Sequence, residues 1–154
     1  FGQASTFAVT VDLPRLEELG ARFLKSIGYS GLAEVEFIED ARDGLFKLLE
    51  VNPRIWGWHT IAVKAGVNLP YLAYMERQGI DISLEDYRKG VKWVRWITDV
   101  PTAAGEIARG RMTPGGYLRS LKGPKEYAVL SWRDPLPFFG EFLLIPFVSR
   151  KRGF

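Results

Sequence analysis

Two runs of alternating residues, separated by a turn signal, constrain the fold of this 154-residue chain more than any other feature. Residues 33–38 alternate acidic with apolar side chains, and residues 45–51 form a second run that is rich in leucine, valine and phenylalanine. Between them, the Asp-Gly pair at 43–44 is typical of a tight turn between antiparallel strands. The pattern predicts a β-hairpin, and a loop centred on this pair would place Glu36 opposite Glu50.

The second run ends in a polar string. Leu48, Glu50 and Asn52 are two residues apart, so on an extended strand their side chains would project to one face. Pro53 ends the strand because it has no N–H group for another ladder bond, and Arg54 places a permanent cation directly beyond it. Carboxylate and amide oxygens suit Mg²⁺, which takes one or two carboxylates and leaves its other positions to water and phosphates. The string therefore predicts a site for a metal ion and a polyphosphate.

The acidic residues have an alternative explanation. Two carboxylates that face each other across neighbouring strands destabilise a sheet unless a cation lies between them. An exposed hairpin in which Glu34, Glu36 and Lys47 are merely solvated would show the same charges. The string from Glu50 to Arg54 favours the binding site over this alternative.

These residues resemble the carboxy-terminal half of the ATP-grasp fold. The resemblance lies in the residues from Gly31 to Phe37, the turn at 43–44 and the string from Leu49 to Arg54, within a match that is most specific over residues 28–75. Within that superfamily the chain is similar to the carbamoyl-phosphate-synthase-like and biotin-carboxylase-like carboxylate–amine ligases. The resemblance implies an enzyme that uses ATP to make an acyl phosphate from a small carboxylate, which an amine then attacks.

The resemblance also implies roles for individual residues. Glu36, Glu50 and Asn52 would hold one or two Mg²⁺ or Mn²⁺ ions that bridge the ATP phosphates. Ile38 would lie against the adenine, and Arg54 would act as the catalytic residue that faces the acyl phosphate or the substrate carboxylate. The family's amino-terminal subdomain and its Gly-rich lid have no counterpart here, because the hairpin begins near residue 33. The resemblance therefore implies a part of a larger ligase, with the missing subdomains as its partners.

The rest of the chain predicts an α+β fold. We expect a small, mostly antiparallel sheet with the hairpin at its centre, covered by helices. Residues 1–80 would form the metal- and ATP-binding part, and residues 81–154 would form a mainly helical carboxy-terminal extension packed on it. Spacing and end signals predict the following elements: helices over 13–27 (capped by Asp12), 59–65 (closed by Gly66), from Asn68 onwards, from Asp99 to 109 and over 114–121, and strands near 7–11, 91–97 and 127–131.

Composition excludes several function classes. The chain has no cysteine, which removes disulfides, thiolate metal sites and a cysteine nucleophile. Its amino terminus lacks the pattern of a signal peptide, so we expect a cytoplasmic location. A net charge of +3, with lysine and arginine spread along the chain, does not favour a nucleic-acid partner. The interleaved arginine and tryptophan at 91–97 are more typical of an edge strand than of a base-stacking platform.

Three aromatic residues behind Arg54 have open roles. Trp56 and Trp58 flank a glycine, and they could form the wall of a substrate pocket. His59 is the only histidine and could titrate near neutral pH. Capping or packing is the alternative role for His59.

The apolar segment at 136–148 predicts a contact surface. It is too short to span a bilayer, which needs about 20 apolar residues. Packing against this domain or against the rest of a larger enzyme is favoured over an interfacial helix on a membrane. If exposed, the segment would promote self-association, so a homodimer is expected. A non-catalytic interaction or membrane-surface module is therefore the alternative to the ligase function.

Overall fold

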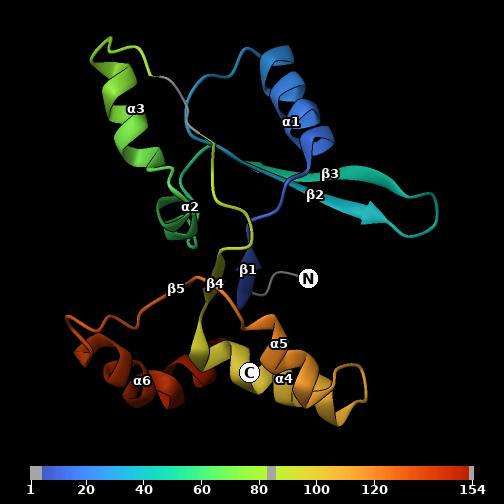
Figure 1. The fold of residues 1–154 in the computed structure, drawn as a ribbon, viewed down its shortest axis with the longest axis vertical. Helices are drawn as coiled ribbons and strands as arrows, with labels where there is room; N and C mark the ends of the chain where they lie inside the picture. Colours follow the sequence, from blue (N-terminus) through green and yellow to red (C-terminus); the bar gives the residue numbers. More distant parts are fainter. Residues whose placement is uncertain (1–4, 83–85, 153–154) are drawn as a thin grey trace. The chain divides into compact units, whose positions relative to one another are not determined.

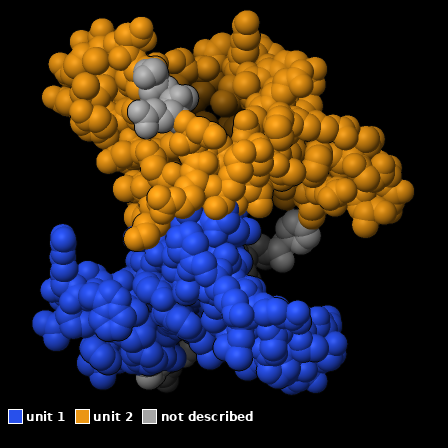
Figure 2. Space-filling view, viewed as in Figure 1, with its two compact units in different colours: residues 1–9, 90–154 blue, residues 10–89 orange. Residues whose placement is uncertain are grey.

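The computed structural model describes residues 5–82 and 86–152, and the chain divides into two compact units (Figure 2). Unit 1 consists of Phe1–Val9 and Gly90–Phe154, and unit 2 consists of Thr10–Lys89. The predicted division after residue 80 stays a prediction, and the unit that contains the hairpin extends to Lys89.

Each unit combines helices with one small sheet (Figure 1). The elements of unit 2 are α1 (Pro14–Ser26), β2 (Glu34–Asp40), β3 (Leu45–Asn52), α2 (Thr60–Ala65) and α3 (Leu69–Arg77). Those of unit 1 are β1 (Phe7–Val9), β4 (Lys92–Val94), α4 (Trp96–Ala108), α5 (Pro114–Ser120), β5 (Lys125–Tyr127) and α6 (Leu136–Arg152). The predicted α+β class is confirmed.

The strands form two separate sheets, which corrects the expectation of one sheet centred on the hairpin. In unit 2, β2 and β3 form a two-stranded antiparallel sheet of their own. In unit 1 the strand order is β1-β4-β5, with β4 antiparallel to β1 and parallel to β5. Among the described residues the hairpin gains no further strand.

The hairpin forms where the alternation predicts it. At the turn, Gly44 has a φ of +64°, a backbone conformation that residues with a Cβ atom rarely adopt. The Asp43 carboxylate accepts a hydrogen bond from the Leu45 N–H group at 2.9 Å, which holds the turn closed. Glu36 lies opposite Glu50, so the predicted register is confirmed.

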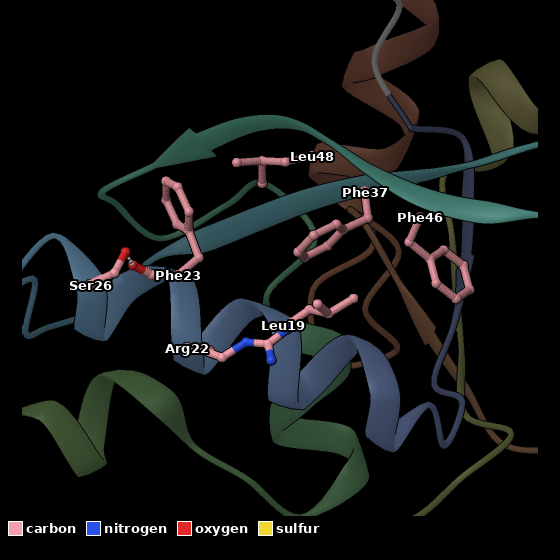
Figure 3. A pocket seen from close by; sticks show the side chains of 7 residues that line it. All are labelled: Leu19, Arg22, Phe23, Ser26, Phe37, Phe46 and Leu48. Atoms are coloured by element: carbon pink, nitrogen blue, oxygen red, sulfur yellow. Dashed lines mark hydrogen bonds between the residues drawn. The ribbon is translucent and has the colours of Figure 1, made fainter.

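A β-bulge interrupts the hairpin just beyond this pair. Phe37 pairs with Leu48 rather than with Leu49, so β3 has one extra residue at this point. The extra residue moves Leu48 to the face that Phe37 occupies, and the two side chains line one pocket (Figure 3). The prediction that Leu48 shares a face with Glu50 is therefore wrong, because it assumed an uninterrupted two-residue alternation.

Helix α1 packs on the Phe37 face of the hairpin. Gly20 is buried in α1, and a Cβ atom there would lie 3.9 Å from the Phe37 ring and 4.0 Å from Val35 Cβ. Helix and strand therefore approach closely. Around this contact lies an open pocket of about 350 Å³, whose apolar lining comes from α1, β2 and β3 (Figure 3): Leu19, Phe23, Phe37, Phe46 and Leu48.

The ends of the helices in unit 2 agree with prediction at two places and differ at one. Gly66 ends α2 with a φ of +111°, and the Asn68 side chain accepts a hydrogen bond from the Tyr71 N–H group at 3.2 Å as the cap of α3. Asp12 does not cap α1. The residue at the cap position is Leu13, and the Asp12 carboxylate forms an ion pair with Lys89 instead.

Strand β4 is the middle strand of unit 1, so the prediction of an edge strand over 91–97 is wrong. Val91, Trp93 and Val94 are buried, which explains the apolar residues on both faces. The strand ends at Val94, and α4 begins at Trp96. The strand predicted over 127–131 lies at Lys125–Tyr127, because these are the residues that pair with β4.

Helix α6 contains the apolar carboxy-terminal segment. Its Glu141 carboxylate accepts a hydrogen bond from Arg95 Nη2 at 2.5 Å, which joins α6 to the residue that precedes α4. Phe138 makes edge-on contacts with Phe139 and Phe142. Over the described residues, none of the helices combines the length and the apolar character that crossing a membrane would require.

Asp99 is the buried charged side chain of unit 1. Its carboxylate accepts hydrogen bonds from the Tyr117 hydroxyl at 2.7 Å and from the Thr6 hydroxyl at 3.2 Å. Partial burial raises the pKa of Tyr117 well above its usual value, and the neighbouring Asp99 carboxylate raises it further. The three residues connect α4, α5 and the residue that precedes β1.

We expect Tyr117→Phe to lower the free energy of unfolding by about 1–3 kcal/mol, because the buried Asp99 carboxylate loses a donor. Tyr127→Phe is the matched control. Its hydroxyl has no hydrogen bond within the described part of the chain, so the change should stay within about 0.5 kcal/mol. Urea denaturation of both variants measures the difference, and equal losses would contradict a specific role for the Tyr117 hydroxyl.

Candidate functional site

The predicted site residues on β2 lie on the face of the hairpin that points away from α1. Val35 and Phe37 are the residues of β2 that approach α1. Side chains alternate along a strand, so Glu34, Glu36 and Ile38 project to the opposite face. Helix packing on one face therefore orients the two carboxylates to the other.

Asn52 connects the two strands on this acidic face. It lies opposite Glu34, and its Nδ2 group donates hydrogen bonds to Glu50 Oε1 at 2.5 Å and to Glu34 Oε2 at 3.3 Å. Glu36 lies opposite Glu50 in the next pair. The three predicted metal ligands therefore occupy neighbouring positions of the hairpin, and Glu34 lies beside them through its hydrogen bond to Asn52.

Arg54 follows directly after the strand, and its side chain lies close to Asn52. Its backbone N–H donates to the Asn52 carbonyl oxygen at 2.8 Å, which turns the chain tightly around Pro53. Its Nη2 atom lies 3.5 Å from Asn52 Oδ1, and Nη1 donates to the Ile55 carbonyl at 3.3 Å. Arg54 is exposed, so most of its guanidinium group remains able to bind an anion.

The acidic face carries electrostatic repulsion. Partial burial raises the pKa of Glu34, and the charges of Glu36 and Glu50 raise it further, against the opposing effects of Asn52 and Arg54. Among the described residues, none donates a hydrogen bond to the Glu36 carboxylate. A cation bound here would relieve this repulsion.

The donor set fits a hard divalent cation held in an open site. Within the described ranges, no three carboxylate, imidazole or thiol side chains converge closely enough to enclose a metal ion. Mg²⁺ needs fewer, because it commonly takes one or two carboxylates and completes its shell with water and phosphate. Glu36 and Glu50 supply this number of carboxylates, and Asn52 would add an amide oxygen. The oxygen of Asn52 now faces Arg54, so ligation would require the amide to turn over.

The remaining candidate site residues are Ile38 and three residues that follow Arg54. Ile38 is 46% exposed and lies on the acidic face, next to Lys47 of β3. The rings of Trp56 and Trp58 contact each other edge-on, with centroids 5.6 Å apart. His59 Nδ1 lies 2.8 Å from the Trp56 carbonyl oxygen, a local contact that is typical of a packing role.

Glu34 is the site residue that the sequence reasoning missed. Glu34 enters the sequence-based predictions only as a solvated charge, although its spacing of two residues from Glu36 places both on one face. What could not be read from the sequence is the hydrogen bond to Asn52, which depends on the register of the hairpin.

Glu34→Gln should stabilise the metal-free protein by about 0.2–1 kcal/mol at pH 7, because it removes a repelled charge and keeps an acceptor for Asn52. The folded-state pKa of Glu34 lies above the unfolded value of 4.5. The protonated carboxyl group of Glu34 therefore contributes to stability below pH 4.5. This contribution is lost as the pH rises through the pKa of Glu34 in the folded protein.

The gain from Glu34→Gln should accordingly vanish in acid. Thermal unfolding in the presence of a chelator measures the gain in stability at pH 7 and at pH 4. Glu39→Gln makes the same charge change on the other face of β2 and is the control. A gain that persists unchanged at pH 4 would contradict repulsion as its cause.

Comparison with known proteins assigns the family. Residues 3–100, which include the whole acidic face, match the family described as "ATP-grasp in the biosynthetic pathway with Ter operon". The chain therefore belongs to the ATP-grasp family.

The chain is also similar to short parts of two much larger proteins. Acetyl-CoA carboxylase of Saccharomyces cerevisiae (strain ATCC 204508 / S288c) is 34% identical over 76 residues, which are 49% of this chain and 3% of that protein. Acetyl-CoA carboxylase 2 of Oryza sativa subsp. japonica is 33% identical over 78 residues, which are 50% of this chain and 3% of that protein. No solved structure matches the chain.

Proposed function

We propose that this chain is the metal- and phosphate-binding part of an ATP-grasp ligase that activates a carboxylate for attack by an amine. The observation that carries this proposal is the pairing of Glu36 with Glu50, with Asn52 next to them and Arg54 directly beyond. Membership of the ATP-grasp family supports the use of ATP. The similarity to the two carboxylases supports the broader ligase class.

Glu36, Glu50 and Asn52 would hold Mg²⁺ or Mn²⁺. When bound, the metal ion would neutralise the phosphates and stabilise the charge that develops during phosphoryl transfer. The carboxylates contribute by being fixed opposite each other on two paired strands, so little rearrangement is needed to bring them to one ion. Their mutual repulsion in the free protein gives the site its preference for a cation.

Arg54 and Ile38 would contact the substrates. Arg54 is a permanent cation with a forked set of donors, which suits the carboxylate substrate or its acyl phosphate. Ile38 offers an exposed apolar side chain on the face that carries Glu36, where it would pack against the adenine ring. The acyl phosphate would form as the carboxylate oxygen takes the γ-phosphoryl group and ADP leaves, and the amine would then displace phosphate.

The proposal includes partners beyond this chain. An amino-terminal ATP-grasp subdomain and a Gly-rich lid would cover the nucleotide and exclude water, which the acidic face of a two-stranded hairpin cannot do alone. ATP, a small carboxylate and an amine would be the substrates, in the cytoplasm, without nucleic acid. The isolated chain is then expected to be inactive.

Glu50→Gln should weaken the binding of Mg²⁺–ATP at least about tenfold, because it removes one of the two opposed carboxylates. Calorimetry should be done on this chain and on a polypeptide that adds the amino-terminal subdomain and the lid. We expect tight binding by the second and feeble binding by the first. Glu39→Gln, on the other face of β2, should leave the affinity unchanged.

Two results would contradict this proposal. Equal losses in Glu50→Gln and Glu39→Gln would show that net charge, and not the acidic face, governs binding. ATP hydrolysis by the isolated chain, abolished by Glu50→Gln, would contradict the need for the further subdomains.

A second candidate function, an interaction module, is favoured by the exposure of α6. Successive residues of this helix are exposed, so apolar side chains lie on all sides of it and not along one stripe: Phe142 (47%), Leu143 (84%), Leu144 (55%) and Ile145 (42%). A helix that is apolar all round is typical of one buried in protein, whereas an interfacial helix has one polar face. A contact with protein, including a second copy of the chain, is therefore favoured over a membrane surface.

If α6 mediates self-association, light scattering should find a homodimer that Leu143→Glu converts to a monomer. The substitution places a charge in the apolar surface of α6, where it would lose its hydration on association. Leu118→Glu, at a position that is 65% exposed on α5, is the matched control and should remain dimeric. A wild-type chain that stays monomeric, or one that co-sediments with liposomes only when residues 136–154 are present, would refute this contact.

A further inference from the structure

An open pocket of about 480 Å³ lies between α3 and the loop that leads into β2 (Figure 1), and we call it the α3 pocket. Four residues of α3 line it, and their spacing of three and four places them on one face of the helix: Leu69, Leu72, Ala73 and Glu76. The loop before β2 and the segment after α3 supply the rest of the lining: Gly31, Leu32, Ile80, Asp81 and Ile82. The volume falls within the range of about 300–1,000 Å³ that is typical of pockets for small molecules.

The polar side chains of the α3 pocket carry charge of one sign. Among the described residues that line it, Glu76 and Asp81 are polar, and the others are apolar residues or glycine. Neither carboxylate has a hydrogen-bond or ion-pair partner in the part of the chain that the structure describes. A ligand that complements this lining has an apolar body and a cationic head, because the body displaces water from the aliphatic side chains and the head pairs with the carboxylates.

The α3 pocket lies at the end of the hairpin that carries Arg54. Leu32 is two residues before Glu34, so the Cα atoms of these residues are at most about 7 Å apart. Glu34 begins β2 and pairs with Asn52, and Arg54 follows two residues later. A ligand in the pocket would therefore lie at the end of the hairpin where Arg54 would hold the acyl phosphate.

We propose that the α3 pocket binds the amine substrate as an alkylammonium ion. Its carbon chain lies against the aliphatic lining, and its charge lies against Glu76 and Asp81. This assignment rests on the proposed function, which requires an amine but does not define its class. The lining disfavours two other classes: an α-amino acid would bring its own carboxylate close to the two acidic side chains, and ammonia would leave the apolar walls uncovered.

Three compounds with the same carbon chain test the charge of the head group. Pentylamine, 1-pentanol and pentanoate carry a positive, a neutral and a negative head at pH 7. Each is titrated into the full chain without Mg²⁺ or ATP, and the amide chemical shifts of Leu72, Ala73 and Ile80 give the dissociation constant. We expect pentylamine to bind most tightly, 1-pentanol more weakly, and pentanoate most weakly of the three.

Substitutions of the lining test where the ammonium ion binds. Glu76→Gln and Asp81→Asn should each weaken the binding of pentylamine about two- to fivefold, because each removes one exposed ion pair. The double variant should bind pentylamine no better than 1-pentanol. Glu18→Gln makes the same charge change on α1, outside the pocket, and should bind pentylamine like the wild type.

A substitution that fills the pocket tests the apolar part of the site. Ala73→Leu extends a side chain into the pocket and should abolish the saturable shifts with all three compounds. Tyr74→Leu, at the next position of α3 but outside the pocket, is the matched control and should bind pentylamine like the wild type. The amide spectrum of each variant, recorded before titration, shows whether unit 2 is folded.

Several results would overturn the proposal. Equal affinities for the three compounds, or an unchanged affinity for pentylamine in the double variant, would refute the cationic head. Saturable binding that persists in Ala73→Leu would place the ligand elsewhere. A wild-type chain whose amide shifts do not saturate with pentylamine would refute the pocket as a binding site.

The failure of this proposal can be distinguished from the failure of the proposed function. Ala73→Leu should leave the affinity for Mg²⁺–ATP unchanged in the polypeptide that adds the amino-terminal subdomain and the lid. Glu50→Gln should leave the binding of pentylamine unchanged, because Glu50 does not line the pocket. If pentylamine binds as expected while Glu50→Gln does not weaken the binding of Mg²⁺–ATP, the proposed function is refuted, and the assignment of the ligand as its substrate is refuted with it.

Discussion

The antiparallel pairing of β2 with β3 is the constraint on which the candidate site depends. Glu36 and Glu50 lie directly opposite each other, and Glu34 lies in the neighbouring pair on the same face. An arrangement of this kind costs stability in the free protein. Partial burial raises the pKa of Glu34, and the charges of Glu36 and Glu50 raise it further. The NH₂ group of Asn52 offsets part of this cost by donating to two of the three carboxylates. A bound cation would relieve the repulsion, which supports the proposed site.

The scaffold explains how a two-stranded sheet can hold this face in place. A lone hairpin is at best marginally stable in water, so the packing of α1 against Val35 and Phe37 supplies the support that further strands would give elsewhere. A Cβ atom at Gly20 would lie at ordinary contact distance from Val35 and Phe37, so the helix packs directly on this face. The bulge at Leu49 adds Leu48 to the packed face without disturbing the pairing of Glu36 with Glu50. One face of the hairpin thereby packs on α1, and the other carries Glu34, Glu36, Glu50 and Asn52.

Several elements and most of the candidate site could be predicted from the sequence, because their signals are local. The turn at Asp43, the cap at Asn68 and the end of α2 at Gly66 each depend on one residue and its near neighbours. The predictions that failed depend on distant partners. Asp12 pairs with Lys89 instead of capping α1, and the strand near Trp93 is buried between β1 and β5 instead of lying at an edge. Periodicity cannot reveal the ion pair or the position of the strand, because it carries no information on which distant segment of the chain packs beside a given residue.

The sequence by itself determined which side chains the acidic face carries. They are two glutamates in register, an asparagine, and an arginine that follows the proline at the end of the strand, and their order also identified the family. The sequence did so because strand alternation and turn geometry are properties of a few consecutive residues. Only the tertiary structure decided which way Leu48 points, that Glu34 holds the Asn52 amide, and that the strands divide into two sheets. Each of these depends on a bulge, a cross-strand hydrogen bond or a pairing between residues far apart in the chain, and such contacts are fixed by the folded backbone as a whole.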